Sequence, residues 1–158
     1  EKADAEVMSW IYSNDNPFYP KDNRPLLWGW DLSTGKIVWE REAHKGVPPQ
    51  PRHARNSFAS ETPVTDGQRV YAYFADIGVF CCDMEGKPVW ELRWESHPMR
   101  DGWGTGTAPV LHKDRLYLQN DNDRESFMAA LDKATGKEVW RVARAEKSNW
   151  SARPAWSA

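Results

Sequence analysis

The chain has 158 residues, of which 10 are tryptophan, and its 21 Lys and Arg residues and 23 Asp and Glu residues leave a formal net charge of −2. Charges of both signs are interspersed without a basic stripe, which excludes an ordinary nucleic-acid-binding surface. No apolar run approaches the roughly 20 residues of a membrane span, and no signal peptide opens the sequence.

The first 30 residues predict two strands joined by a loop. Residues 5–12, AEVMSWIY, could form a short amphipathic helix, but the repeats described below favour an inner strand of an incomplete sheet. Residues 14–25 are rich in turn formers and predict a loop. Leu26–Trp30 then predicts a strand that runs into the first copy of a repeated motif.

This turn-and-strand motif occurs three times. It reads DLSTGKIVW at residues 31–39, DMEGKPVW at 83–90 and DKATGKEVW at 132–140. We expect the Asp to accept hydrogen bonds from the backbone amides of the turn, and the Gly to supply the positive φ that the turn needs. Pro88 places the strand after the turn at the edge of its sheet, because proline removes a donor from the ladder. The positions expected to be structural are Asp31, Gly35, Trp39, Asp83, Gly86, Trp90, Asp132, Gly136 and Trp140.

Two four-stranded units accompany the second and third copies. In the first unit, one strand is expected to begin at Pro63 and Val64. Three further strands are expected at Val70–Phe74, Val79–Cys82 and Pro88–Arg93. The second unit repeats this plan 46 residues later, with Val110, Arg115 and Tyr117 in place of Val64, Arg69 and Tyr71. Met128–Leu131 has helical propensity, but its match to Val79–Cys82 predicts a strand. Trp150–Trp156 resembles the lead-in to these units and predicts the start of another.

The spacing of the motif predicts an all-β fold, a β-propeller. The Gly and Trp positions are 51 and 50 residues apart, and a period near 50 made of short strands is typical of four-stranded propeller blades. Val and Trp are adjacent in every copy, although neighbouring strand residues point to opposite faces. We therefore expect both faces of each sheet to be covered, as in blades stacked around an axis. A β-sandwich with one solvated face per sheet should show alternation instead.

The length is enough for about three blades, whereas closed propellers typically have four to eight. We expect a partial blade at 1–46, blades at 47–96 and 97–147, and the start of a further blade at 148–158. An arc of three blades leaves two sheet faces uncovered. The chain is therefore expected to be a segment of a longer propeller, or to complete its ring by homo-oligomerisation.

Function is expected on the face opposite the repeated turns, where the connections between blades and between second and third strands gather. Variable loops on one face of a repeat scaffold are where binding is usually placed. Arg can act as a fork for carboxylates and Trp as a stacking surface, so these loops could hold an anion, a sugar or a quinone; the competing interpretation is that they cap neighbouring blades. The ligand-binding candidates are Arg52, His53, Arg55, Asn56, His97, Arg100, Asp101, Trp103, Asp121 and Asn122.

No metal or catalytic site is predicted. Residues 120–126, NDNDRES, offer oxygen ligands but lack the glycine and the position-12 glutamate of an EF-hand loop, so we expect a solvated loop. The four histidines show no metal-ligand spacing, and no nucleophile, phosphate-binding or dinucleotide-binding fingerprint is present. Cys81 and Cys82 correspond to Ala130 and Leu131 in the next unit, which favours apolar packing on opposite faces over a strained vicinal disulfide.

The motif DxxTGKxxW, complete at 31–39 and 132–140, resembles the tryptophan-docking motif of the pyrroloquinoline-quinone-like (PQQ-like) repeat family. The middle copy is one residue shorter and lacks the Thr. The resemblance runs from about Leu26 onward and implies a propeller fold. The family includes quinone-dependent alcohol and sugar dehydrogenases, BamB-type lipoproteins of outer-membrane assembly, and exported bacterial propellers of unassigned role, to which ASETPVTDG (59–67) and ALDKATGKEVWR (130–141) are most similar.

The resemblance implies a periplasmic or secreted bacterial protein. We expect a non-catalytic binding or scaffolding propeller that takes a protein, small-molecule or sugar ligand on its loop face, with no cofactor. One alternative is a fragment of a PQQ-dependent dehydrogenase that uses PQQ and Ca²⁺ and whose catalytic residues lie in blades outside this segment; such enzymes often have a vicinal cysteine pair over the cofactor. Cys81 and Cys82 instead lie inside the repeat motif, so no catalytic residue is transferred. A second alternative is a carbohydrate-binding propeller that uses Trp103 and its neighbours.

Overall fold

The computed structural model describes residues 5–11, 25–44, 49–53 and 60–151. Within these ranges the chain forms eleven strands and one short 3-10 turn, η1 (Arg100–Gly102). The predicted all-β fold is therefore confirmed, including a strand where Met128–Leu131 has helical propensity. No helix among the described residues has the length and apolarity needed to cross a bilayer.

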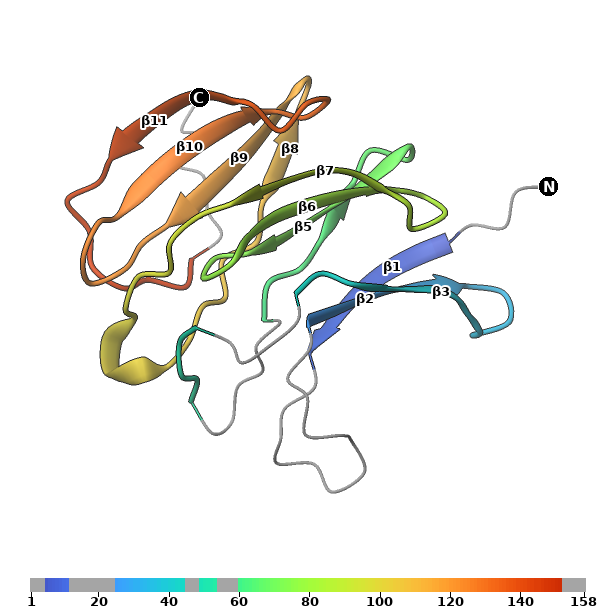
Figure 1. The fold of residues 1–158 in the computed structure, drawn as a ribbon, viewed down its shortest axis with the longest axis horizontal. Coiled ribbons are helices and arrows are strands. Elements are labelled where there is room, and N and C mark those ends of the chain that lie inside the picture. Colours follow the sequence, from blue (N-terminus) through green and yellow to red (C-terminus); the bar gives the residue numbers. More distant parts are fainter. Residues whose placement is uncertain (1–4, 12–24, 45–48, 54–59, 152–158) are drawn as a thin grey trace.

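The strands form three antiparallel sheets that lie side by side (Figure 1). The N-sheet contains β1 (Ala5–Ile11), β2 (Pro25–Asp31) and β3 (Ile37–Glu42) in that order. The middle sheet contains β4 (Val64–Thr65), β5 (Arg69–Phe74), β6 (Gly78–Asp83) and β7 (Pro88–Arg93). The C-sheet contains β8 (Val110–His112), β9 (Arg115–Asn120), β10 (Phe127–Asp132) and β11 (Glu138–Ala143). Each sheet is a meander, and β3, β7 and β11 are edge strands, as Pro88 predicts.

The core lies in the two interfaces between consecutive sheets, which we call seams. In β5 and β6 nearly every residue is buried, so both faces of the middle sheet are covered at these strands. Tyr71, Tyr73 and Val79 face the C-sheet and pack with Leu116 and Leu118. The opposite face packs on the N-sheet through a second cluster, formed by Leu27, Ala43, Ala72, Phe74, Ile77 and Phe80.

The three repeated turns have the predicted geometry. Gly35, Gly86 and Gly136 have φ values of 67°, 78° and 73°, in the region that favours glycine. Asp31 Oδ1 accepts hydrogen bonds from the Ser33 and Thr34 amides at 2.9 Å each. The Asp83 and Asp132 carboxylates likewise accept from amides of their own turns.

Two of the motif tryptophans lie at equivalent places in the two seams. The Trp39 indole lies against Gly86 of the next sheet, where an added Cβ would come within 2.7 Å of Trp39 Cδ2, and Trp39 Nε1 donates to the Met84 carbonyl at 2.9 Å. Trp90 repeats this arrangement against Gly136, with Nε1 donating to the Lys133 carbonyl at 3.0 Å. Glycine is required at the receiving position because the ring occupies the space of a side chain.

The motif valines differ from the expectation that both faces are covered. Val38, Val89 and Val139 are 54%, 43% and 47% exposed. That expectation is therefore wrong for the outermost strand, although it is correct for β5 and β6. The physical reason is that sheets arranged like spokes diverge with distance from the axis, so a short side chain at the rim does not reach the neighbouring sheet while a Trp does.

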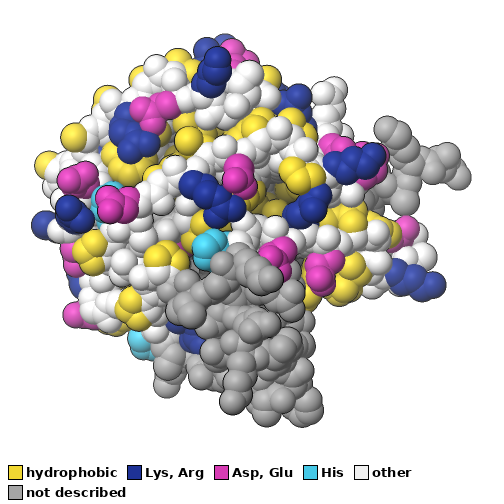
Figure 2. All heavy atoms as spheres, in the orientation of Figure 1, with side chains coloured by type: hydrophobic (Ala, Val, Ile, Leu, Met, Phe, Trp, Pro, Cys, Tyr) yellow, Lys and Arg dark blue, Asp and Glu magenta, His cyan; other side chains and the backbone are white. Residues whose placement is uncertain are grey.

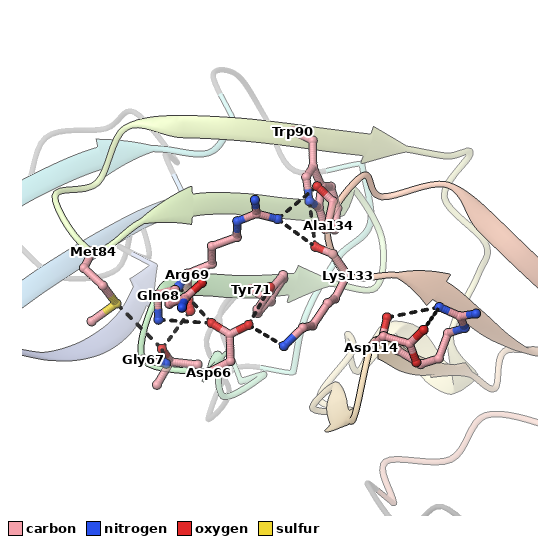
Figure 3. A network of polar contacts seen from close by, with 12 residues as sticks. Asp66, Gly67, Gln68, Arg69, Tyr71, Met84, Trp90, Asp114, Lys133 and Ala134 are labelled. Atoms are coloured by element: carbon pink, nitrogen blue, oxygen red, sulfur yellow. Dashed lines mark hydrogen bonds and ion pairs between the residues drawn. The ribbon is translucent and has the colours of Figure 1, made fainter.

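A polar network joins the middle sheet and the C-sheet on the face of the repeated turns (Figure 3). Arg69 Nη1 donates to the Ala134 carbonyl at 2.9 Å, and Lys133 Nζ pairs with Asp66 Oδ2 at 2.7 Å. Asp66 also accepts from Tyr71 Oη and from the Arg69 amide. These contacts fix the turn side of this seam.

Cys81 and Cys82 are buried free thiols. Cys81 belongs to the cluster that faces the C-sheet, and its neighbour on the strand faces the N-sheet, because successive strand residues alternate. Burial raises the pKa of Cys81 to about 12 and that of Cys82 to about 11. Apolar packing on opposite faces, as predicted from the sequence, is confirmed.

Candidate functional site

The loops opposite the repeated turns gather on one side of the molecule (Figure 1). They comprise residues 49–53 and 60–63 between the first two sheets, 94–109 between the second and third, the β5–β6 and β9–β10 connections, and 144–151. This arrangement confirms that the connections between blades share a face. The candidates Arg55 and Asn56 lie outside the described residues.

An exposed aromatic group, which we call the tryptophan patch, consists of His53, Trp103 and Trp150. Trp103 is 42% exposed. Its ring lies edge-on to His53, with centroids 6.0 Å apart, and is tilted against Trp150 at 5.7 Å. The patch therefore combines side chains from three loops that are far apart in the sequence.

Backbone contacts hold the patch in place. The His53 amide donates to the Trp103 carbonyl at 3.2 Å, and Trp150 Nε1 donates to the Gly104 carbonyl at 2.7 Å. Gly102 and Gly104 have φ values of 64° and 80°. An added Cβ on Gly102 would come within 2.8 Å of Pro51, so the two loops approach more closely than other residues would permit.

Two further candidates, Arg100 and Asp101, lie in η1 beside the patch. The Arg100 amide donates to Ser148 Oγ at 2.8 Å, which ties η1 to the loop that carries Trp150. Asp101 is exposed and has a φ of 51°. Arg52 lies close to Gly104: a Cβ added to Gly104 would be 3.3 Å from the Cβ of Arg52. The structure thus brings Arg52, His53, Arg100, Asp101 and Trp103 into one region.

Asp121 and Asn122 do not form the solvated loop expected from the sequence. They are 2% and 1% exposed. Asp121 Oδ1 accepts from Arg144 Nε at 2.7 Å, and Asp121 Oδ2 accepts from Gln119 Nε2 at 2.8 Å. Asn122 Oδ1 accepts from the amides of Arg124 and Glu125. The expectation is wrong because Arg144, from a later loop, covers the carboxylate; both candidates shape the β9–β10 connection.

His97, the remaining candidate, is half-buried, and its Nδ1 is buried without a hydrogen-bond partner among the described residues. Among the described residues, no hydrogen bond or ring contact joins His97 to the tryptophan patch.

Sequence reasoning missed a buried carboxyl group beneath these loops. Glu61 is 3% exposed, and its Oε1 accepts from the Ala75 amide at 3.2 Å and from the Thr105 hydroxyl. Burial raises the pKa of Glu61 from 4.5 to about 7, the Thr105 hydrogen bond opposes this shift, and Asp76 adds to it. Burial also raises the pKa of Asp76, from 3.8 to about 6. The sequence did offer one signal. The two four-stranded units are offset by 46 residues, so Glu61 is equivalent to Thr107, and both side chains are buried.

Glu61 should make the stability of the fold depend on pH. Because its pKa is higher in the folded state, its contribution is complete below about pH 4.5 and is lost as pH rises through about 7. At about 1.4 kcal/mol per pKa unit, the free energy of unfolding is expected to fall by about 3 kcal/mol across this range. Urea denaturation at several pH values should show this slope. Glu61→Gln should remove the part due to Glu61 and leave the part due to Asp76, which is of similar size and is lost as pH rises through about 6. An unchanged slope in Glu61→Gln would contradict the assignment.

The described residues contain no group of three or more His, Cys, Asp or Glu side chains arranged to hold a metal ion. The loop face presents one exposed aromatic ring, Trp103, with the charged residues Arg100 and Asp101 beside it in the sequence.

Comparison with known proteins agrees with the observed fold. A family model described as "Outer membrane protein assembly factor BamB" matches residues 11–153. No curated protein is significantly similar to the chain.

Several solved structures are similar in fold. The quinohemoprotein alcohol dehydrogenase ADHIIG of Pseudomonas putida HK5 is 17% identical, with a TM-score of 0.58, over 88% of this chain and 22% of that protein. The quinohemoprotein alcohol dehydrogenase of Comamonas testosteroni is 15% identical, with a TM-score of 0.53, over 89% and 23%. BamB of Moraxella catarrhalis is 14% identical, with a TM-score of 0.49, over 77% and 32%. The chain thus spans less than a third of each of these proteins.

Proposed function

The chain belongs to the BamB-like family of PQQ-like repeat propellers, and on this premise we propose that it is a non-catalytic binding propeller whose tryptophan patch contacts another protein. The observation that carries the proposal is Trp103, which is 42% exposed yet fixed between His53 and Trp150. Large aromatic side chains that are held rigidly contribute most of the energy in many protein interfaces. They also lose little conformational entropy on binding.

The surroundings of the patch favour a protein partner. Arg100 and Asp101 lie next to the aromatic rings and provide both charges, as in the polar rim of an interface. The family description names an assembly factor of outer membrane proteins, a role that involves contact with other proteins. We extend this to an exported bacterial protein that acts as a scaffold.

A photo-cross-linking amino acid in place of Trp103 should test the contact. The chain would be produced in the bacterial periplasm and irradiated, and discrete cross-linked products are expected. Leu32 is the matched control, since it is 55% exposed but lies on the opposite, repeated-turn face. The absence of products at position 103, or identical products at position 32, would contradict the proposal.

The quinone-dehydrogenase alternative receives no support from the residues present. Its vicinal cysteine pair would lie over the cofactor, whereas Cys81 and Cys82 are buried in β6 and face two different seams. Adding PQQ and Ca²⁺ and measuring dye reduction with alcohols or aldoses tests this directly; turnover would overturn the non-catalytic proposal.

A carbohydrate ligand is a second candidate, favoured by one observation. Trp103 exposes an aromatic ring two residues after the exposed carboxylate of Asp101, and sugars bind to such combinations of a flat apolar ring and polar groups. A glycan array would show selective binding that Trp103→Ala abolishes.

A further inference from the structure

The seam between the N-sheet and the middle sheet contains a cavity of about 210 Å³. It opens at the rim between β3 and β7. Its floor is formed by Leu27, Ala43, Phe80 and Cys82, which are all buried. Figure 2 shows hydrophobic atoms between the charged side chains that border this seam.

The cavity results from the identity of two residues. Ala43 lies four positions after Trp39, and the residue four positions after Trp90 is Trp94. We call the seam between the N-sheet and the middle sheet the first seam, and the seam between the middle sheet and the C-sheet the second. In the second seam, Trp94 packs on Tyr73 and Phe127, with ring centroids 5.7 and 6.0 Å away. In the first seam an alanine methyl group replaces this indole.

The opposite wall is also smaller. Cys82 lies directly before Asp83, and the residue directly before Asp132 is Leu131, which is fully buried in the second seam. The two seams have the same tryptophan contacts and the same strand arrangement. Because Ala43 and Cys82 are smaller than Trp94 and Leu131, less side-chain volume fills the first seam than the second. A well-packed interior has few voids of this size, which makes the space a candidate ligand site.

The rim of the cavity provides a cationic group. Arg41 Nε donates to the Gly86 carbonyl at 2.9 Å, which fixes the guanidinium at the mouth. Among the described residues no partner is found for the two terminal nitrogens of Arg41. A guanidinium in this state can bind a carboxylate through two parallel hydrogen bonds.

Arg93 and Glu91, which also line the cavity, are paired with each other. Glu42 lines the cavity too and takes part in an interaction of its own. Arg93 bonds both carboxylate oxygens of Glu91 at 3.2 Å and the Ala43 carbonyl at 3.2 Å, and its guanidinium lies 4.9 Å from the centre of the Phe80 ring. Arg93 therefore acts as a wall of the cavity, and Arg41 is the group that distinguishes between ligands.

We propose that this seam cavity binds a small amphipathic carboxylic acid, with its apolar body between Ala43, Phe80 and Cys82 and its carboxylate on Arg41. An apolar cavity of about 150 Å³ accepts benzene, so the larger cavity has room for one aromatic ring with a short chain. An acid is expected to bind better than an amine because Arg41 is the charged lining residue whose terminal nitrogens have no partner among the described residues.

The test uses the whole chain, with 3-phenylpropionate as the acid probe and 3-phenylpropan-1-ol as its neutral counterpart. Ligand-observed NMR titration is expected to show saturable binding of the acid. Arg41→Leu installs the residue found at the equivalent position, Leu92, and should weaken binding of the acid about tenfold, the scale of one charge-assisted hydrogen bond. Binding of the alcohol should not change in this variant.

Filling the cavity should abolish binding of both probes. Ala43→Trp and Cys82→Leu each install the side chain that the second seam already holds, so each is compatible with this fold; if one does not fold, the other decides. Ala143→Trp adds an indole on the exposed strand β11 and serves as the control for non-specific aromatic contact. The proposal is overturned by no saturable binding to the unmodified chain, or by binding that survives in the filled variants.

Discussion

Replacing Arg144 with methionine is expected to lower the free energy of unfolding by about 3–5 kcal/mol, the range found when one partner of a buried ion pair is removed. The Asp121 side chain is 0% exposed, and Arg144 contacts both of its carboxylate oxygens, at 2.7 and 3.2 Å. Without Arg144, the carboxylate retains only the hydrogen bond from Gln119 within the described residues. Urea denaturation at neutral pH measures the loss.

Two variants make this prediction specific. Adding Asp121→Asn to Arg144→Met should restore part of the stability, because an amide leaves no unpaired charge. Lys147→Met, on the same loop, removes an exposed charge whose one hydrogen bond among the described residues goes to the Asp123 carbonyl, and its effect should stay within about 0.5 kcal/mol. A loss in Arg144→Met no larger than that of Lys147→Met would show that the pair does not stabilise the loop.

Trp90→Ala is expected to cost about 3 kcal/mol, the low end of the range for large buried aromatic residues, because Trp90 is partly buried. The indole fills the space above Gly136, donates to the Lys133 carbonyl at 3.0 Å and packs on Tyr71, so its removal opens the seam at the rim. Trp140→Ala provides the comparison within the same chain. Trp140 is 37% exposed and contacts Tyr117 of its own sheet, and its loss should cost about 1 kcal/mol. Thermal or urea unfolding of the two variants measures the difference.

The receiving glycines provide an independent control. Gly136→Ala and Gly35→Ala introduce the same strain at similar φ values of 73° and 67°. Only at Gly136 would the new Cβ meet an indole, 2.5 Å from Trp90 Cε3, whereas no described atom lies within 4 Å of a Cβ at Gly35. Gly136→Ala should therefore be the more destabilising change, and equal effects would show that the indole contact contributes little.

The sequence predicted the sheets well because one motif marks each sheet at a fixed period. The Asp, Gly and Trp of that motif have roles that depend on short-range geometry, namely a hairpin turn and a ring placed on the next turn. Strand assignments such as Met128–Leu131 followed from register, even where propensity favoured a helix.

Prediction failed where burial depends on a distant residue. Nothing near Asp121 in the sequence indicates that Arg144, 23 residues later, covers it, so an acidic loop was expected to be solvated. Glu61 was missed for the same reason, because its environment comes from Ala75 and Thr105. The exposed motif valines could not be predicted from an apolar pattern alone, since that pattern does not say how far apart two sheets are at the rim.

The one-way contact of each indole with the following sheet has a consequence for how such chains can change in length. Trp39 reaches Gly86 and Trp90 reaches Gly136, and in both cases the indole N–H bonds the carbonyl of the residue after the motif Asp. A tandem duplication of one whole unit would therefore reproduce this tryptophan contact at the new junction, and the loss of one unit would bring together two surfaces that already have matching partners. The unit of evolutionary gain and loss is then the segment from one tryptophan to the next, and arrays of different size can be built from it without redesigning that contact.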